Sequence, residues 1–246
     1  MIVRDRRLRW PIADEFEAAV HHQIVRGVDR RAKYLLIRLE IGTVILHLGM
    51  SGSLRLVSGG TQPKAHDHWD LVLDSGLALR FHDPRRFGSL HFTKDDPAKH
   101  ALLKKLAPEP LSSKFNREYL FNATRRRLIP IKQLIMNSQL VVGVGNIYAS
   151  EALFRARISP RRAAGRITRA EAEKLAKAIK AVLTAAIKIG GTTLRDYVNA
   201  DGAPGYFRQK LFVYERAKQA CRVCKSPVKQ FTQGQRSTYW CSTCQR

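Results

Sequence analysis

Hydrophobic and polar positions alternate differently in the two halves of the chain. In about the first hundred residues, apolar side chains occur in short runs rich in β-branched and aliphatic types, which is typical of strands. The predicted strands cover residues 34–39, 43–48, 54–57, 69–73 and 77–81. Residues 40–42 and 74–76 contain glycine and separate neighbouring strands by the length of a hairpin turn. Short strands at this close spacing predict a β-sandwich or a barrel.

A helical pattern replaces the strand pattern between about residues 95 and 189. The clearest helix covers residues 170–183, where Leu175, Ile179 and Val182 recur at helical spacing on one side. Thr168 precedes Glu171 by three positions, which fits a capping box at the start of this helix. Residues 190–191 are both glycine and are predicted to end it.

These changes of pattern divide the chain into three predicted domains. A β domain covers residues 1–95, a helical domain covers residues 108–210, and a small cysteine-containing tail covers residues 211–246. Pro108 and Pro110 interrupt the chain at the first boundary. Residues 199–205, rich in glycine, aspartate, asparagine and proline, are predicted to form a loop. The fold class is therefore α+β, with several domains.

The chain is strongly basic. Its 246 residues contain 44 lysines and arginines against 20 aspartates and glutamates, which gives a formal net charge of +24. The hydrophobic share of 44% excludes a disordered polycation, because it is large enough to form a core. A positive excess spread along the whole chain favours a polyanionic partner, most commonly nucleic acid, over a basic protein that is merely soluble.

The sequence contains no recognisable membrane or export signal. No run approaches the roughly 20 apolar residues that a membrane-spanning helix needs. Residues 1–7 are highly charged and lack the apolar core of a signal peptide. We therefore expect a cytoplasmic protein with no membrane partner, whose cysteines are reduced.

The four cysteines of the chain form two close pairs near the C-terminus. Cys221, Cys224, Cys241 and Cys244 have the spacing C-x2-C-x16-C-x2-C. Two thiolates three positions apart can reach one tetrahedral zinc ion, and the intervening segment is long enough for a β-hairpin. We expect one structural Zn²⁺ that folds a tail too small to fold alone, rather than disulfides or free thiols. Taken alone, such a hairpin is equally consistent with an RNA-binding zinc ribbon.

Three further segments carry weaker signals of nucleic-acid binding. Residues 82–88 place two arginines beside Phe87 at a turn, which suits insertion into a base stack, although a core phenylalanine anchoring a turn has the same pattern. Residues 125–127 are three arginines, whose usual meaning is a solvated face. Residues 143–146 precede a helical pattern, so this helix N-terminus could bind phosphate, or Asn146 could simply cap it.

Together these segments resemble the bacterial formamidopyrimidine-DNA glycosylases, bifunctional enzymes that remove oxidised purines. The resemblance runs from about Leu8 to the C-terminus and includes the cysteine hairpin. Its other motifs, in chain order, are RRAKYLL (30–36), HLGMSGS (47–53), DPRRFG (83–88), VVGVGNIYASE (141–151), GGTTL (190–194) and DGAPGYF (201–207). The arginine–phenylalanine turn favours this family over its pyrimidine-preferring endonuclease relatives.

The resemblance implies an N-terminal β-sandwich, a helix–two-turn–helix domain and a C-terminal four-cysteine zinc finger. It implies a monomer whose partner is double-stranded damaged DNA, placed with the bacterial nucleoid. The implied function is base-excision repair of 8-oxoguanine and formamidopyrimidines, by removal of the base and cleavage of the strand at the abasic site. The loop at residues 199–205 corresponds to one that covers the flipped base.

The resemblance also assigns roles to individual residues. Lys33 and Arg236 match catalytic positions that contact phosphate and act in β-elimination and δ-elimination, respectively. Met50, Arg85 and Phe87 match the wedge that fills the gap left by a flipped nucleotide. The other matched DNA-binding positions are His66, Arg127, Lys132 and Asn146, with arginine at position 127 where the family often has lysine.

The first residues depart from the family pattern. Family members begin, after loss of methionine, with Pro-Glu-Leu-Pro-Glu, and the proline amine attacks the sugar C1′ to form a Schiff base. This sequence begins Met1-Ile2-Val3-Arg4, part-way into that pattern and without its first helix. One expectation is that the natural protein has the missing segment, through a misplaced start or a truncation. The other is a paralogue that binds damaged or abasic DNA without chemistry.

Either origin predicts impaired glycosylase turnover for a polypeptide of these 246 residues. The Lys33 amine could support slow cleavage at abasic sites as a surrogate nucleophile. A role for Lys33 as a clamp on phosphate fits equally well.

Overall fold

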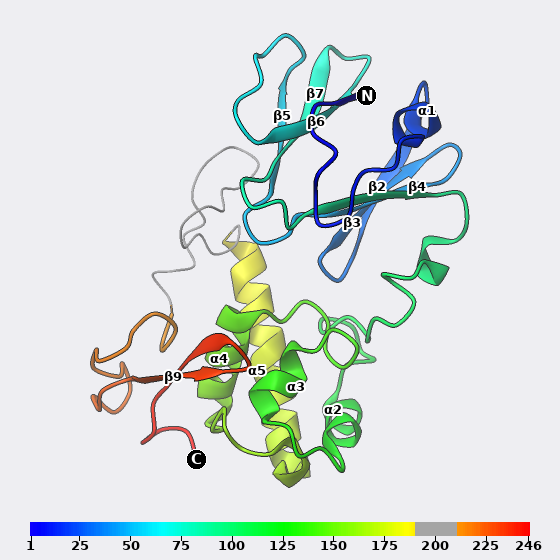
Figure 1. Ribbon diagram of the computed structural model, residues 1–246. Coiled ribbons are helices and arrows are strands. Elements are labelled where there is room, and N and C mark those ends of the chain that lie inside the picture. The colour runs from blue at the N-terminus through cyan, green and yellow to red at the C-terminus, as the bar shows by residue number, and fades with distance from the viewer. Residues whose placement is uncertain (190–210) are drawn as a thin grey trace. The chain divides into compact units, whose positions relative to one another are not determined.

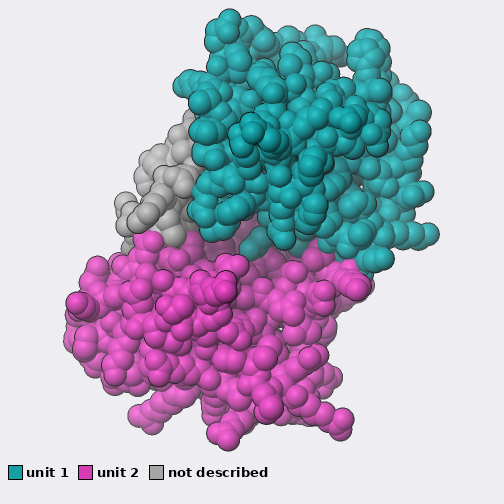
Figure 2. All heavy atoms as spheres, viewed as in Figure 1, with its two compact units in different colours: residues 1–104, 191–206 teal, residues 105–190, 207–246 magenta. Residues whose placement is uncertain are grey.

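The computed structural model describes residues 1–189 and 211–246, which divide into two compact units (Figures 1 and 2). Among the described residues, unit 1 contains residues 1–104 and unit 2 contains residues 105–189 and 211–246. The predicted helix stop at residues 190–191 and the predicted loop at residues 199–205 lie outside the described residues, as do the motifs at 190–194 and 201–207.

Unit 1 is built from two antiparallel four-stranded sheets (Figure 1). The first sheet has the order β1–β6–β7–β5, with β1 at Ile2–Val3, β6 at Asp67–Val72, β7 at Leu77–His82 and β5 at Ser53–Ser58. The second has the order β2–β3–β4–β8, with β2 at Val25–Arg31, β3 at Tyr34–Leu39, β4 at Thr43–His47 and β8 at Ser89–Thr93. The five predicted strands are confirmed as β3, β4, β5, β6 and β7.

The hydrophobic core of unit 1 lies between the two sheets. Trp69 of β6 and Phe81 of β7 stack with their ring centroids 5.3 Å apart. They belong to one buried cluster with residues of the second sheet, namely Ile37, Leu39, Val44, Leu46 and Leu90. Because successive side chains of a strand alternate between faces, Asp70 and Arg80 lie on the opposite face of the first sheet. The predicted β-sandwich is therefore confirmed.

The segment between β1 and β2 contributes to the same core. It contains the five-residue helix α1 at Phe16–Val20. Four of its apolar residues are buried in the cluster, namely Leu8, Ile12, Phe16 and Val20. A helix this short leaves too few turns for its periodicity to be recognised in the sequence, so α1 was not predicted.

Unit 2 begins with helices. These are α2 at Arg117–Thr124, α3 at Ile131–Met136, α4 at Asn146–Ala156 and α5 at Arg169–Lys188. The predicted capping box is confirmed, because Thr168 Oγ1 accepts from the Glu171 N–H at 3.2 Å and Glu171 Oε2 accepts from the Thr168 N–H at 2.9 Å. The buried side of α5 packs against α2 and α4, as its apolar spacing predicts.

A β-hairpin follows in the C-terminal part of unit 2. It consists of β9 at Lys229–Gln233 and β10 at Arg236–Trp240, and β10 contacts α4. One cysteine pair precedes the hairpin and the other follows it, as the spacing predicts. In the parts of the chain that the structure describes, no helix has the length and apolar character needed to cross a membrane.

Candidate functional site

A sharp turn at residues 83–88 follows β7 and is organised by the Asp83 carboxylate. Asp83 is fully buried, and its Oδ2 accepts a hydrogen bond of 2.8 Å from the Gly88 N–H. Its Oδ1 accepts from the Arg85 N–H at 3.3 Å and from the Ser51 hydroxyl at 2.7 Å. One carboxylate therefore shapes this turn and ties it to the loop after β4, which carries Ser51.

Met50, Arg85 and Phe87 gather at the surface of these two segments. Met50 is 64% exposed and Phe87 is 44% exposed, which is unusual for large apolar side chains. The Arg85 guanidinium lies 5.0 Å from the centre of the Phe87 ring, and its Nη2 lies 3.7 Å from the Met50 sulfur. Apolar side chains beside a cation can enter a base stack while the cation contacts phosphate. The structure therefore brings the three predicted wedge residues together.

Gly49 permits the close approach of the two segments. Its φ is +73°, and a Cβ at this position would lie 2.5 Å from the carbonyl carbon of Phe87. A side chain here would be strained and would push the turn away. Gly49 therefore helps to set the position of Met50 relative to Phe87.

Lys33 lies at the two-residue turn between β2 and β3, where Ala32 has a φ of +55°. The Lys33 side chain is exposed, and its charge acts on His47. Burial, followed by the positive charges of Lys33 and Arg9, lowers the pKa of His47 to about 4. A neutral His47 fits its hydrogen bond, in which Nδ1 accepts from the Gly49 N–H at 2.9 Å. Lys33 is thus electrostatically coupled to the base of the Met50 loop.

His66 lies at the end of the loop between β5 and β6. It is exposed and has a φ of +70°, and its carbonyl accepts a hydrogen bond of 3.0 Å from the Asp83 N–H. The loop that carries His66 is therefore joined to the turn that carries Arg85 and Phe87.

Lys132 and Asn146 meet the cysteine hairpin inside unit 2. Lys132 is only 1% exposed, and its Nζ donates to Asn146 Oδ1 at 2.6 Å and to Thr238 Oγ1 at 2.7 Å. The Ser237 carbonyl accepts from Lys132 Nζ at 3.3 Å and from Asn146 Nδ2 at 3.0 Å. Burial, with a smaller contribution from the charge of Arg236, lowers the pKa of Lys132 to about 8.

Arg236 is the first residue of β10 and is exposed beside this group. With Lys132, Gln133 and Gly234 it lines a cavity of about 250 Å³. Arg127 lies on a separate turn after α2, where its side chain is exposed and its carbonyl accepts from the Gly165 N–H at 2.8 Å. The structure therefore gathers Lys132, Asn146 and Arg236, and places Arg127 elsewhere in unit 2.

The four cysteines converge as a metal site requires. Their sulfur atoms all lie within 4.8 Å of one another, with 4.0 Å between Cys221 and Cys244 and 3.4 Å between Cys224 and Cys241. These distances are too long for disulfides. A tetrahedral ion with bonds of about 2.3 Å to sulfur needs sulfurs roughly 3.8 Å apart. The cluster therefore fits a zinc finger.

Glu151 anchors the segment before the first cysteine pair. It is 1% exposed, and its carboxylate accepts from the N–H groups of Phe212, Val213 and Tyr214, at 2.9, 2.9 and 3.0 Å. Tyr214 OH in turn lies 3.3 Å from Asn146 Nδ2. This role of Glu151 is not recognisable from the sequence, because its three partners lie about sixty positions further along the chain.

The chain matches two sequence models of one class of DNA-repair protein. Residues 1–90 match the formamidopyrimidine-DNA glycosylase N-terminal domain, and residues 106–198 match the formamidopyrimidine-DNA glycosylase H2TH domain. Among curated relatives, the formamidopyrimidine-DNA glycosylases of Thioalkalivibrio sulfidiphilus and Pseudomonas putida are 55% and 54% identical to it. Each alignment covers 100% of this chain and 91% of the relative.

Solved structures give the same result. The MutM (Fpg) protein from Thermus thermophilus superposes with a TM-score of 0.87 and 40% identity, over 99% of this chain and 89% of that one. A Lactococcus lactis Fpg mutant, solved in complex with DNA containing Fapy-dG, gives a TM-score of 0.92 and 27% identity, over 100% and 90% of the two chains. The matching family models and the fold define a DNA glycosylase. The chain belongs to the formamidopyrimidine-DNA glycosylase family.

Proposed function

We propose that this protein recognises oxidised purines in duplex DNA, removes the damaged base and cleaves the strand at the resulting abasic site. Membership of the family supports this assignment. Related Lactococcus lactis proteins have been solved with DNA containing Fapy-dG and with DNA containing an abasic site. The observation that carries the proposal is the exposed cluster of Met50, Arg85 and Phe87 on two segments held by Asp83.

The exposed cluster acts as a wedge in this proposal. Flipping a nucleotide out of a duplex costs a few kcal/mol of stacking and pairing. Phe87 and Met50 offset part of that cost by filling the space that the base leaves, while the Arg85 guanidinium contacts the strand. Fixing the turn through Asp83 lowers the entropy lost when the wedge inserts.

Phosphate contacts come from both units. Lys33, His66 and Arg85 supply them from unit 1, and Arg127, Asn146 and Arg236 supply them from unit 2. Lys132 is buried and already donates three hydrogen bonds, so we assign it to positioning Asn146 and the hairpin. Several such contacts make binding strongly dependent on salt concentration.

The cleavage steps are assigned to the two exposed cations. In β-elimination after base loss, the C2′ proton is removed and the C3′–O bond breaks, so that the 3′ phosphate leaves with the bonding electrons. Lys33 contacts the DNA backbone there and takes part in this proton transfer. Arg236 stabilises the remaining phosphate in δ-elimination. Both groups are exposed, as a residue that touches the DNA backbone must be.

We assign one zinc ion to Cys221, Cys224, Cys241 and Cys244. Four thiolates leave no open position, so the ion is structural and its binding energy contributes to folding of the hairpin. The hairpin presents Arg236, and through Ser237 and Thr238 it holds Lys132 and Asn146. We propose that the protein acts on DNA as a monomer.

Two roles at abasic sites are open to Lys33. Lys33 either serves as a surrogate amine at abasic sites or clamps a phosphate there. Its exposed position at the turn between β2 and β3 supports both roles equally.

Borohydride trapping tests these assignments. The polypeptide is mixed with duplexes that carry 8-oxoguanine, an abasic site or no damage, and the formamidopyrimidine-DNA glycosylase of Thioalkalivibrio sulfidiphilus serves as the positive control. We expect selective binding of both damaged duplexes, with a covalent adduct at the abasic site that is lost in Lys33→Met if Lys33 is the amine. Selective binding without any adduct would assign the polypeptide to damage recognition alone. Equal binding of damaged and undamaged duplexes would overturn the proposal.

A further inference from the structure

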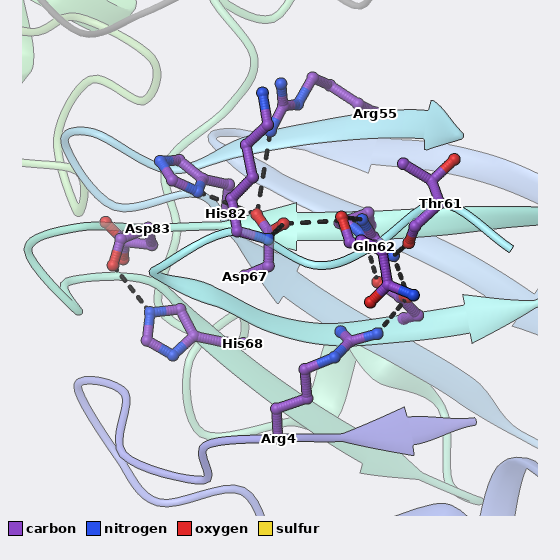
Figure 3. Close-up of polar contacts among 11 residues, drawn as sticks. Arg4, Arg55, Thr61, Gln62, Asp67, His68, His82 and Asp83 are labelled. Carbon is purple, nitrogen blue, oxygen red and sulfur yellow. Dashed lines mark hydrogen bonds and ion pairs between the residues drawn. The ribbon is translucent and has the colours of Figure 1, made fainter. Parts of the chain in front are cut away.

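The face of the first sheet opposite the core carries a network of charged side chains (Figure 3). It includes Asp67 on β6, Arg80 and His82 on β7, and Arg55 on the neighbouring strand β5. Asp67, Asp70 and Arg80 are 5%, 2% and 2% exposed. Charges this deeply buried are stable only when they are paired, so the network is a built feature of the fold rather than a solvated face.

Arg80 joins the sheet to the loop between β5 and β6. Its Nε and Nη2 donate to the Asp70 carboxylate at 2.9 and 2.8 Å, and Arg4 donates to the same carboxylate at 2.6 Å. Although burial opposes ionisation, these two arginines lower the pKa of Asp70 to about 2. The Arg80 guanidinium also donates to the carbonyls of Thr61 and Gln62, at 2.8 and 3.2 Å. The loop is therefore held by its backbone while its own side chains stay exposed.

Asp67 fixes both the end of this loop and the ring of His82. Its Oδ2 accepts from the Lys64 N–H at 2.7 Å, and its Oδ1 lies 2.9 Å from His82 Nδ1. An ionised carboxylate offers only acceptors, so His82 Nδ1 carries the hydrogen of this bond. The second ring nitrogen, Nε2, is then the atom that remains for a ligand.

The His82 ring reaches the surface beside His66. The His82 side chain is 26% exposed, whereas that of its partner Asp67 is 1% exposed. The two histidine rings meet edge to face, with their centroids 6.1 Å apart. Across residues 1–189 and 211–246, the bond to Asp67 is the one hydrogen bond that the His82 side chain makes. His82 also directly precedes the turn that carries Arg85, so its ring lies among candidate DNA contacts.

We propose that His82 is a further DNA-binding residue, whose imidazolium is oriented by Asp67 and donates Nε2–H to a phosphate oxygen beside His66. The proposal rests on the proposed function, since it needs a duplex over this face. The ring then has a carboxylate behind it and a phosphate in front of it, and both negative charges attract an imidazolium. Arg55 from β5 and Arg80 from β7 are the cations around the pair, and the His66 ring is its neighbour from the loop.

The test measures affinity for a duplex with a stable abasic-site analogue at about pH 6 and about pH 8, either side of ordinary imidazole titration. His82→Phe keeps a ring beside His66 and removes the donor. We expect it to bind roughly tenfold more weakly at the lower pH, as for loss of one charged hydrogen bond, with a smaller deficit at the higher pH. His82→Lys keeps a cation beside Asp67 and should stay within about threefold of the wild type at both pH values. His21→Phe, which alters an exposed histidine after α1, is the matched control and should bind like the wild type.

Three outcomes would overturn the assignment of His82. One is wild-type affinity of His82→Phe at both pH values. Another is an equal loss at both pH values that lysine fails to rescue, which would indicate only a structural role. A third is an equal loss in His21→Phe. Failure of the wild type itself to prefer the abasic duplex would instead overturn the proposed function.

Discussion

The Lys132 ammonium donates a hydrogen bond of 2.6 Å to the side-chain oxygen of Asn146. Both side chains also bind the Ser237 carbonyl, so this pair joins α3 and α4 to the cysteine hairpin. A buried ammonium is tolerated only when its donors are paired, and here three acceptors surround it. Lys132 therefore fixes the position of Asn146, which we propose to contact a DNA phosphate.

Replacing Lys132 should affect both stability and binding. Lys132→Met leaves Asn146 Oδ1 and Thr238 Oγ1 without their shared donor in a buried place, and we expect a loss of about 2 kcal/mol in the free energy of unfolding. Because Asn146 is released, affinity for abasic duplex should also fall. Urea unfolding and fluorescence anisotropy measure the two effects. Lys174→Met, on the exposed side of α5, makes the same change of charge and should alter neither. Unchanged binding in Lys132→Met would contradict the positioning role.

Phe87→Ala should reduce discrimination more than affinity. The ring contributes to the damaged complex only after a nucleotide has been flipped, so its removal should leave binding to undamaged duplex nearly unchanged. We expect the preference for abasic over undamaged duplex to fall about tenfold. This corresponds to roughly 1.4 kcal/mol of binding free energy that the ring contributes by occupying the gap left by the flipped nucleotide. Competition binding measures the ratio of the affinities for abasic and undamaged duplex. Leu111→Ala removes another exposed apolar side chain, in unit 2, and serves as the control. Intact selectivity in Phe87→Ala would remove the basis for the wedge.

Arg236→Ala should weaken binding to all duplexes alike. An exposed arginine that contacts phosphate does not distinguish one base from another. Without it, one counterion fewer is released from the DNA on binding. The slope of log affinity against log salt should therefore become shallower by about 0.9. Titrations at several salt concentrations measure this slope. Arg246→Ala, at the exposed C-terminal residue, is the control. A selective loss for damaged duplex alone would show that Arg236 reads the lesion instead.

The periodicity of the sequence predicted the elements whose residues repeat. The residues of β3 to β7 alternate between apolar and polar or form apolar runs. α5 has five turns of amphipathic spacing and a capping box. In each case the pattern of neighbouring residues was sufficient to predict the element. α1 escaped prediction because five residues contain too little pattern. β2 at Val25–Arg31 also escaped, because its side chains are mostly exposed and polar.

The candidate site was predictable only where chemistry is local. The cysteine spacing predicted the convergence of four sulfurs, which the structure confirms. The burial of Lys132 depends on Thr238, more than a hundred positions away, and no window of sequence contains both. The pairing of Asp67 with His82 depends likewise on the register between β6 and β7. Such contacts follow from the tertiary fold, so residue type alone cannot reveal them.

His47 should make stability fall in mild acid. Its pKa is about 4 in the folded protein, against an ordinary value of 6.5. Between these values the unfolded chain binds a proton that the folded protein does not, so stability is full above about pH 6.5 and is lost as the pH falls towards 4. For this partly buried group we expect a loss of about 2 kcal/mol, measured by urea unfolding across that range. His47→Asn keeps an acceptor for the Gly49 N–H without titrating, and should flatten the profile.

The same titration tests the placement of Lys33. Its positive charge helps to depress the pKa of His47, so Lys33→Met should raise that pKa, as followed by NMR of the imidazole. Lys64→Met removes an exposed charge from a different loop and should leave the titration unchanged. An unshifted His47 in Lys33→Met would mean that Lys33 does not lie near the base of the Met50 loop.

Removal of the metal should disorder the hairpin and weaken DNA binding while leaving unit 1 folded. Without an ion, no bond joins the two cysteine pairs, and β9 and β10 have little core of their own. Loss of the hairpin also frees Lys132 and Asn146, which bind Ser237 and Thr238. We expect one zinc per chain by elemental analysis, and after chelation loss of the NMR signals of residues 221–246 with those of the β-sandwich retained.

Cys241→Ser should reproduce the effect of chelation, because Cys241 is a fully buried member of the proposed ligand set. Ser242→Ala changes the next residue without touching a sulfur ligand and should keep both the metal and the affinity. Affinity for abasic duplex should fall in parallel with zinc content across chelator concentrations. Full DNA affinity in zinc-free protein would show that the hairpin folds, and presents Arg236, without the ion.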